Sequence, residues 1–174
     1  MEFVFETAYG QKATAAMARA LRKTVRKKHS RRTHVFGWIV MLLAVLLTLP
    51  LGDRPFAFNG KTVVTYLVVL IILLVLLFED SLNGYFARKR MLKGADRAKA
   101  TFCENGYYSE TEIGNTEWQY ENIGTVAETK DYFVFVFGQN HAQVYDKNNL
   151  TGGSAEDFRA FIQDKTKKTI VSVR

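Results

Sequence analysis

Two long stretches without a charged residue constrain the fold of this chain more than any other feature. Asp, Glu, Lys and Arg are absent from residues 33–52 and again from residues 62–78. A helix that spans a bilayer needs about 20 mostly apolar residues, with about 17 as the lower limit. A surface helix of a soluble protein shows a polar stripe, whereas both stretches are apolar all round. We therefore predict a transmembrane hairpin over residues 35–78, with spans at 35–51 and 62–78.

The basic residues that flank the spans predict their orientation. Eight Lys or Arg residues lie between Arg19 and Arg32, before the first span, and six lie between Arg88 and Lys99, after the second. The connecting loop holds only two. Because cytoplasmic flanks carry the excess of Lys and Arg, we expect a multi-pass protein of the cytoplasmic membrane with both termini in the cytoplasm. The long basic lead, which no small-residue cleavage site follows, argues against a cleaved signal peptide.

The predicted spans lack the residues that transport requires. Their polar side chains are Thr48, Thr65 and Tyr66. Ion and proton pathways use ionisable residues inside the bilayer, and carrier sites use helices interrupted by Gly or Pro. The spans also contain no G-x-x-x-G pattern for close helix pairing. We interpret them as an anchor.

Charge is distributed along the chain in blocks. The formal net charge of +7 is the sum of +7 in residues 1–34, +1 in 52–61, +3 in 79–99 and −4 in 100–174. We predict a short strand and a basic amphipathic helix in the first block, and a membrane-proximal stem over residues 79–97. The sequence pI of about 9.5 therefore reflects the membrane flanks. The acidic last block has no basic stripe, which argues against binding of nucleic acid.

The cations beside the spans are candidate ligands of anionic lipid headgroups. Each Lys or Arg near an anionic leaflet contributes about 1 kcal/mol of attraction. The simpler alternative is that these residues only set the topology. We call the candidate residues the basic collar, and they are Arg19, Arg22, Lys23, Arg26, Lys27, Lys28, Arg31, Arg32, Arg88, Lys89 and Arg90.

Residues 98–174 alternate between polar and apolar side chains, which is typical of half-buried strands. Asn105-Gly106 is a strong signal for a two-residue hairpin turn. The segment 131–137 is apolar on both faces from its second residue onward, which favours a central strand. The segment 141–145 returns after a turn. We predict a small cytoplasmic antiparallel β-sheet.

A C-terminal helix and an N-terminal strand complete this sheet in our prediction. Ser154 with Asp157 three residues later is a capping pattern for a helix over 154–167. The strand predicted at residues 1–6 is expected to join the sheet at its edge, where it would protect that edge from aggregation. The fold class is thus a membrane α+β protein. The residues expected to build the module structurally are Trp118, Tyr132, Phe135, Phe158 and Phe161.

No catalytic, cofactor-binding or metal-binding residues are predicted. Cys103 is the only cysteine, and a nucleophilic pair with His141 on a neighbouring strand lacks a residue that would orient it. The three His and one Cys do not have the spacing of metal ligands. A phosphate-binding loop is also absent. We expect a protein that is not an enzyme and holds no cofactor.

The chain resembles a known family over nearly its whole length. The residues that carry the resemblance are Gly106-Tyr107, Trp118, 123–126, Glu128-Thr129, 131–133, 142–147 and the Phe158-Arg-x-Phe161 helix. Together with two short spans, they are similar to the YcxB-like family of bacterial membrane proteins. The resemblance implies a pleckstrin-homology-type (PH-like) sheet with a capping helix, and the bacterial inner membrane as location. It implies no catalytic residue.

Three hypotheses for function follow. In the first, the cytoplasmic module binds a protein partner or self-associates. In the second, the basic collar senses anionic lipid. In the third, the protein protects its producer against a membrane-active peptide, a task that suits small basic proteins with two spans.

Overall fold

The computed structural model describes residues 2–49 and 59–173 as two compact units. The first unit comprises residues 1–26 and 80–174, and the second comprises residues 27–79. The last two residues of the predicted span 35–51 lie outside the described residues.

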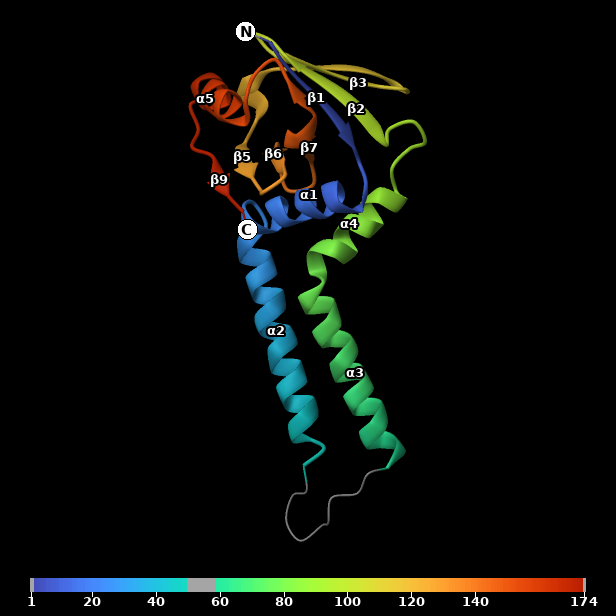
Figure 1. Ribbon diagram of the computed structural model, residues 1–174. Coiled ribbons are helices and arrows are strands. Elements are labelled where there is room, and N and C mark those ends of the chain that lie inside the picture. The colour runs from blue at the N-terminus through green and yellow to red at the C-terminus, as the bar shows by residue number, and fades with distance from the viewer. Residues whose placement is uncertain (1, 50–58, 174) are drawn as a thin grey trace. The chain divides into compact units, whose positions relative to one another are not determined.

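We call the first unit the module (Figure 1). Its described residues contain nine strands and three of the five helices. One of these helices, α4, begins one residue before the boundary of the module. Its strands are β1 (Phe3–Ala8), β2 (Arg97–Phe102), β3 (Tyr107–Thr111), β4 (Gly114–Trp118), β5 (Thr125–Glu128), β6 (Tyr132–Val136), β7 (Ala142–Asp146), β8 (Leu150–Thr151) and β9 (Val171–Ser172). Its helices are α1 (Gln11–Lys23), α4 (Glu79–Lys89) and α5 (Ala155–Thr166), with short 3₁₀ turns η1 (Tyr120–Asn122) and η2 (Lys147–Asn149).

The strands form two sheets rather than one meander. The first sheet has the order β4-β3-β2-β1-β8, and the second has the order β7-β6-β5-β9. The N-terminal strand joins the first sheet as predicted, but its predicted place at the edge is wrong. It pairs with β2 over six residues and with β8 over two, because the chain returns beside it after β7.

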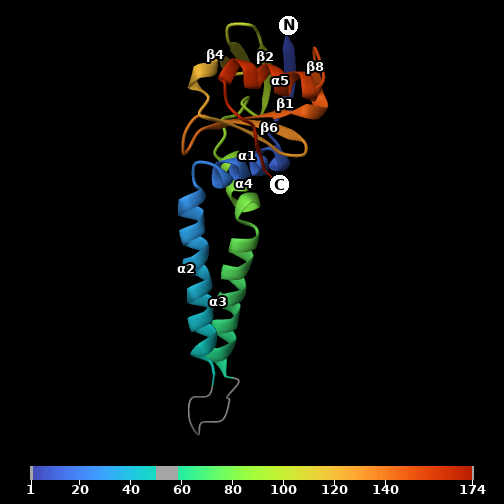
Figure 2. The ribbon, with the colours of Figure 1, turned by 90° about the vertical axis from the view of Figure 1, so that its left-hand side faces the viewer.

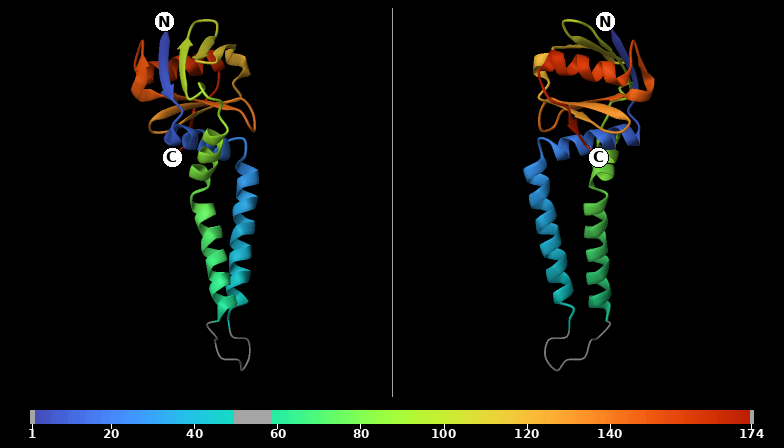
Figure 3. Two further views of the ribbon diagram at one scale, coloured as in Figure 1. Left: turned by 90° about the vertical axis from the view of Figure 1, so that its right-hand side faces the viewer. Right: turned by 60° about the vertical axis from the view of Figure 1, so that its left-hand side comes forward.

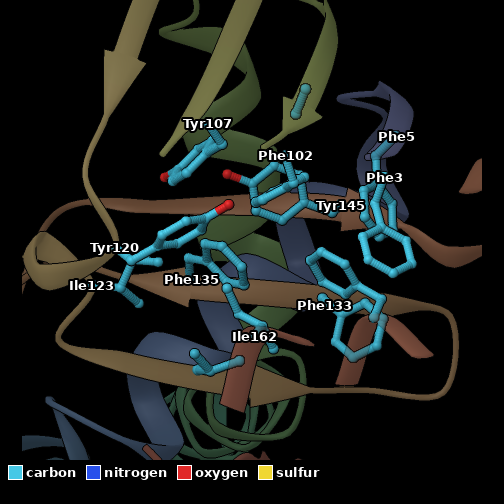
Figure 4. Close-up of a cluster of buried hydrophobic side chains, with 13 residues drawn as sticks. Phe3, Phe5, Phe102, Tyr107, Tyr120, Ile123, Phe133, Phe135, Tyr145 and Ile162 are labelled. Atoms are coloured by element: carbon cyan, nitrogen blue, oxygen red, sulfur yellow. The ribbon is translucent and has the colours of Figure 1, made fainter. Parts of the chain in front are cut away.

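Aromatic side chains fill the space between the two sheets (Figure 4). Phe5 of β1 is fully buried in this cluster, with its ring 4.6 Å from that of Phe158 and 5.6 Å from that of Phe102, centroid to centroid. Helix α5, whose place beside the sheets is seen in Figures 2 and 3, belongs to the same core. Its residues Phe158 and Ile162 are part of the cluster. Its predicted capping box is present, because Ser154 and Asp157 exchange side-chain-to-backbone hydrogen bonds.

The predicted structural residues all pack in the module. Phe135 and Phe158 are fully buried in the aromatic cluster, and Trp118 and Phe161 pack against it. Tyr132 packs against a second cluster, in which α1 covers the other face of the β5–β6–β7 sheet (Figure 3). The module therefore consists of two sheets and a helical layer.

Three local predictions need correction. The sequence predicts a turn at Gly114-Asn115 between β3 and β4, but this turn falls at residues 112–113. The last strand, β9, pairs in parallel with β5, so the second sheet is mixed. The basic helix expected before the spans ends at Lys23 and is followed by a turn over residues 24–26. The basic residues from Lys27 onward belong to the first turns of a separate helix, Lys27–Leu46.

The second unit is a pair of packed helices, α2 (Lys27–Leu46) and α3 (Gly60–Leu77) (Figure 1). Gly37 of α2 faces the side chain of Leu76, and a Cβ at this glycine would lie 2.8 Å from a methyl carbon of that leucine. Within the described residues, α3 is the one helix long and apolar enough to span a membrane. Helix α2 begins with a basic segment and is described only as far as Leu46.

The full burial of Phe5 among four other aromatic rings yields a prediction for stability. Replacement Phe5→Ala removes a fully buried ring, so we expect a loss of about 3–5 kcal/mol in the free energy of unfolding of the module. Denaturant unfolding of the full chain in detergent, followed by tryptophan fluorescence, measures it. The control Val4→Ala truncates a half-buried neighbour on the opposite face of β1 and should cost much less. Equal losses in the two variants would contradict the central role of Phe5.

Candidate functional site

An open groove lies where the two sheets of the module diverge. It has a volume of about 550 Å³ and is bordered by β3, β4, β7, α1 and α4. We call it the seam groove. Its apolar lining includes Met17, Met91, Ile113, Trp118 and Ala142.

One side of the seam groove is the edge strand β4. The residues from Gly114 to Glu117 are exposed, and β4 pairs only with β3 in its sheet. The other edge strands are β7, β8 and β9, of which the last two are only two residues long. The edge of β7 is tied to β1, because Thr7 Oγ1 accepts a hydrogen bond of 3.0 Å from the Asp146 N–H. Thus β4 is the long exposed edge among the described strands.

Trp118 marks the end of β4 that lies nearest the core. Its ring centroid is 4.7 Å from that of Phe137 and 5.3 Å from that of His141. Its indole N–H is buried and has no hydrogen-bond partner among the described residues. Burying a hydrogen-bond donor without a partner costs free energy. A hydrogen-bond acceptor bound at this end of the groove would therefore be favourable, although the walls of the groove are apolar.

A second, polar groove of about 770 Å³ lies between α1 and the β5–β6 turn. Glu128 sits in its wall and accepts hydrogen bonds from Arg159 Nη2 at 2.8 Å and from Lys147 Nζ at 2.5 Å. The hydrogen bonds from Arg159 and Lys147 hold the pKa of Glu128 below its usual value despite burial. This cluster joins β5, α5 and η2, so we assign it a structural role.

The structure separates the basic collar into two groups. Arg19 and Arg22 form an ion-pair cluster with Asp80, which accepts bonds of 2.6 Å from Arg22 Nε and 3.2 Å from Arg19 Nε. Burial raises the pKa of Asp80, but hydrogen bonds and charge from the two arginines outweigh it and leave that pKa below its ordinary value of 3.8. Arg26 also has protein partners, since it donates to the Gln139 carbonyl at 2.6 Å.

The remaining residues of the collar are exposed to solvent. They are Lys23, Lys27, Lys28, Arg31, Arg32, Arg88, Lys89 and Arg90. On α2, Arg31 and Arg32 adjoin an apolar patch that contains Val35, Phe36 and Ile39. Lipid contact by the collar stays a prediction, and these residues are the ones placed to make it.

Helix α1 packs closely on α4 beside the Asp80 cluster. A Cβ at Gly84 would lie 2.6 Å from the backbone nitrogen of Ala15. Gln11 Nε2 also donates to the Ser81 carbonyl at 2.8 Å. The sequence carries a signal for this contact, because Asp80 is an acidic residue that closely follows an apolar stretch and lies between basic segments. The exposed edge of β4 was missed, because single-sequence alternation does not show which strand is at an edge.

The structure does not bring Cys103 and His141 together on neighbouring strands. Cys103 lies in the β2–β3 turn of the first sheet, and His141 precedes β7 in the second. The neighbouring-strand arrangement, which the sequence left open as a possibility, is therefore not present. Among residues 2–49 and 59–173, no group of three or more His, Cys, Asp or Glu is placed to hold a metal ion.

The fold and the groove define an α+β protein in which a two-sheet module is continuous with a helix apolar enough to span a membrane. Residues 102–162, about a third of the chain, match the family described as YcxB-like protein. This match confirms, over that segment, the family resemblance seen in the sequence. No match was found among curated proteins, and none was found among solved structures.

The Asp80 cluster predicts a pH-dependent contribution to stability. Near neutral pH, Asp80→Asn removes the charge that Arg19 and Arg22 bind, so we expect a loss of about 2 kcal/mol. A carboxyl whose pKa is lowered by folding stabilises the fold above its unfolded pKa and loses that contribution as the pH falls through the folded pKa. The difference between wild type and variant should therefore shrink below about pH 3.8. Thermal unfolding of the full chain across pH measures it.

The matched control is Asp96→Asn, since Asp96 is an exposed carboxylate of the same module. It should change stability little at any pH. A pH-independent difference between wild type and Asp80→Asn would contradict the role of the Asp80 charge.

Proposed function

We propose that this protein is a non-enzymatic inner-membrane protein in which the segments 35–51 and 62–78 cross the bilayer as a hairpin. The pairing of β1 with β2 supports this topology. Two strands of one sheet must lie on the same side of a membrane, so a chain that crosses with α3 must cross once more between β1 and β2. The segment that includes α2 is the apolar stretch available for it. The basic flanks favour a cytoplasmic location for the module.

The function we propose for the module is binding of a protein partner or self-association. The observation that carries the proposal is the exposed edge strand β4 beside the apolar seam groove. An exposed sheet edge offers unpaired backbone N–H and C=O groups to an incoming strand, and adjacent pockets give selectivity. A PH-like module with two sheets and a C-terminal helix is well suited to this role, because its rigid core holds the edge in place.

Site-specific photo-crosslinking tests this proposal. A photoreactive amino acid at Thr116, in the full chain in its native membrane, should give a discrete protein adduct after illumination. Thr116 lies on the exposed edge and lines the groove, so a bound strand would be within reach. Adducts are detected by denaturing electrophoresis.

The matched control carries the same photoreactive group at Gln163, an exposed position on α5. This position should give no discrete adduct. The proposal fails if position 116 gives the same pattern as position 163.

A second candidate function is recognition of anionic lipid, and it rests on the exposed part of the basic collar. Arg31 and Arg32 follow two lysines on α2 and precede the apolar patch at Val35. Cations next to apolar residues match the boundary between headgroups and acyl chains, where amphipathic helices bind.

Native mass spectrometry of the full chain tests this function. In micelles supplied with equal amounts of phosphatidylglycerol and phosphatidylcholine, wild type should retain the anionic lipid several-fold better. The double variant Arg31→Glu, Arg32→Glu should lose this preference, because it replaces attraction by repulsion. The double variant Lys130→Glu, Lys167→Glu, at exposed sites of the module, should keep it. An unchanged preference in the α2 variant would exclude the collar as the lipid site.

A further inference from the structure

We propose that the occupant of the β4 edge is a second copy of this chain, paired through its own β4 about a two-fold axis at Thr116. The inference deepens the proposed function and rests on it, because it names the partner of that edge. It depends on the register of three strands, on the residues that this register brings together, and on where α4 lies.

The register of the first sheet shows which backbone groups of β4 point outward. The Cys103 N–H donates to the Gly106 carbonyl at 2.9 Å, so this pair closes the β2–β3 turn with a hydrogen bond. Hydrogen-bonded and non-hydrogen-bonded pairs alternate along an antiparallel ladder. Counting back from this turn, Tyr108 and Glu110 bond to β2, and the intervening residues of β3 turn to β4.

The β3–β4 turn gives the same result independently. Two residues separate the partners Thr111 and Gly114, and in such a hairpin the flanking pair is hydrogen-bonded. Thr116, two residues further on, therefore bonds inward to β3. Asn115 and Glu117 point their backbone N–H and C=O groups away from the sheet.

A two-fold axis at Thr116 matches these outward groups to each other. Asn115 of one copy then lies opposite Glu117 of the second copy, and both are residues with free edge groups. Each such pair exchanges two backbone hydrogen bonds, and symmetry supplies the pair twice. The central pair, Thr116 with its symmetry mate, is a non-hydrogen-bonded pair, in which side chains approach most closely.

The side chains are compatible with this register. The Glu117 carboxylate lies opposite an amide, so no like charges meet across the junction, whereas a one-residue shift toward Glu117 would place the two glutamates together. Thr–Thr pairs are favourable across strands. Trp118 lies opposite Gly114 of the second copy, which has no side chain to obstruct the indole. The strand carries neither Lys nor Pro, and its one charge, on Glu117, does not face a like charge in this register.

The position of α4 is also compatible with two copies anchored in one membrane. Antiparallel strands of a continuous sheet are related by a two-fold axis perpendicular to the sheet, so both copies present the same face to the same side. Ala87 of α4 lines the seam groove together with Ser109 and Thr116, so the end of α4 lies on that face of β3 and β4. Both α4 helices would lie on one side of the joined sheet, and each follows directly from α3 in the chain.

Cysteine crosslinking in membranes tests the register. The full chain with Cys103→Ser and Thr116→Cys should form a reducible dimer at about twice the 19.8 kDa of the chain. Non-hydrogen-bonded pairs have Cα atoms about 4.5 Å apart, within the range that a disulfide requires. Asn115→Cys and Glu117→Cys, each alone in the same background, should crosslink at least several-fold less. Co-expressed, these two variants should crosslink to each other.

A proline substitution separates edge pairing from folding. Asn115→Pro removes an outward N–H that β3 does not use, and proline is tolerated on edge strands in this orientation. Added to the Thr116→Cys reporter, it should abolish the dimer, whereas the matched Asn115→Ala should keep it. Thermal unfolding should be similar for the two variants, which shows that the module still folds.

Three outcomes would overturn the pairing. The first is equal crosslinking of all three single cysteines, which indicates random collision. The second is a Thr116→Cys dimer that Asn115→Pro leaves intact. The third is a Thr116 photo-adduct with a different protein and no Thr116→Cys dimer, which refutes self-pairing while the proposed function stands. Absence of both the photo-adduct and the dimer refutes the proposed function as well.

Discussion

The burial of β1 between β2 and β8 is the constraint on which the rest of the structure depends. Phe3 and Phe5 reach the aromatic core from a strand that precedes the apolar helices, whereas every other strand follows them. The fold of the module therefore closes only when the chain before α2 and the chain after α3 meet. The apolar helices are an insertion into one folded unit. If α3 spans a membrane, the chain would therefore have to cross that membrane a second time between β1 and β2.

Two further contacts strengthen this closure at the base of the module. Gly84 lets α4 approach the backbone of Ala15, and Asp80 binds Arg19 and Arg22 of α1. Small-residue packing and a charge-assisted bidentate pair together fix the position and the rotation of one helix on the other. The arginines also change the meaning of the chain's basic balance. Part of the positive charge that the sequence predicts to face the lipid surface is instead paired with Asp80 within the module.

The sequence predicted those features that short-range patterns encode. The N-terminal strand, the capping box at Ser154, the central strand β6 and the helix over α3 all follow from periodicity or capping chemistry. Three features could not be predicted in this way. The division into two sheets, the parallel pairing of β9 and the interior place of β1 depend on which segments meet across the chain. The candidate site belongs to this second group, because an edge strand is defined by the neighbour that it lacks.

The proposed pairing of β4 edges buries little surface, and its strength depends on the proposed anchoring of the chain in a membrane. A few backbone hydrogen bonds and two symmetry-related indole contacts bury less surface than a stable soluble dimer requires. Association in solution also costs translational and rotational freedom, which consumes most of the interaction energy. Anchoring by the helices would remove much of that cost, because two chains held in one plane with the same face presented have a high effective concentration. A weak edge can then pair reversibly in the membrane. The short strand and the single charge of Glu117 keep the same edge from recruiting unrelated strands as strongly as a long apolar edge would.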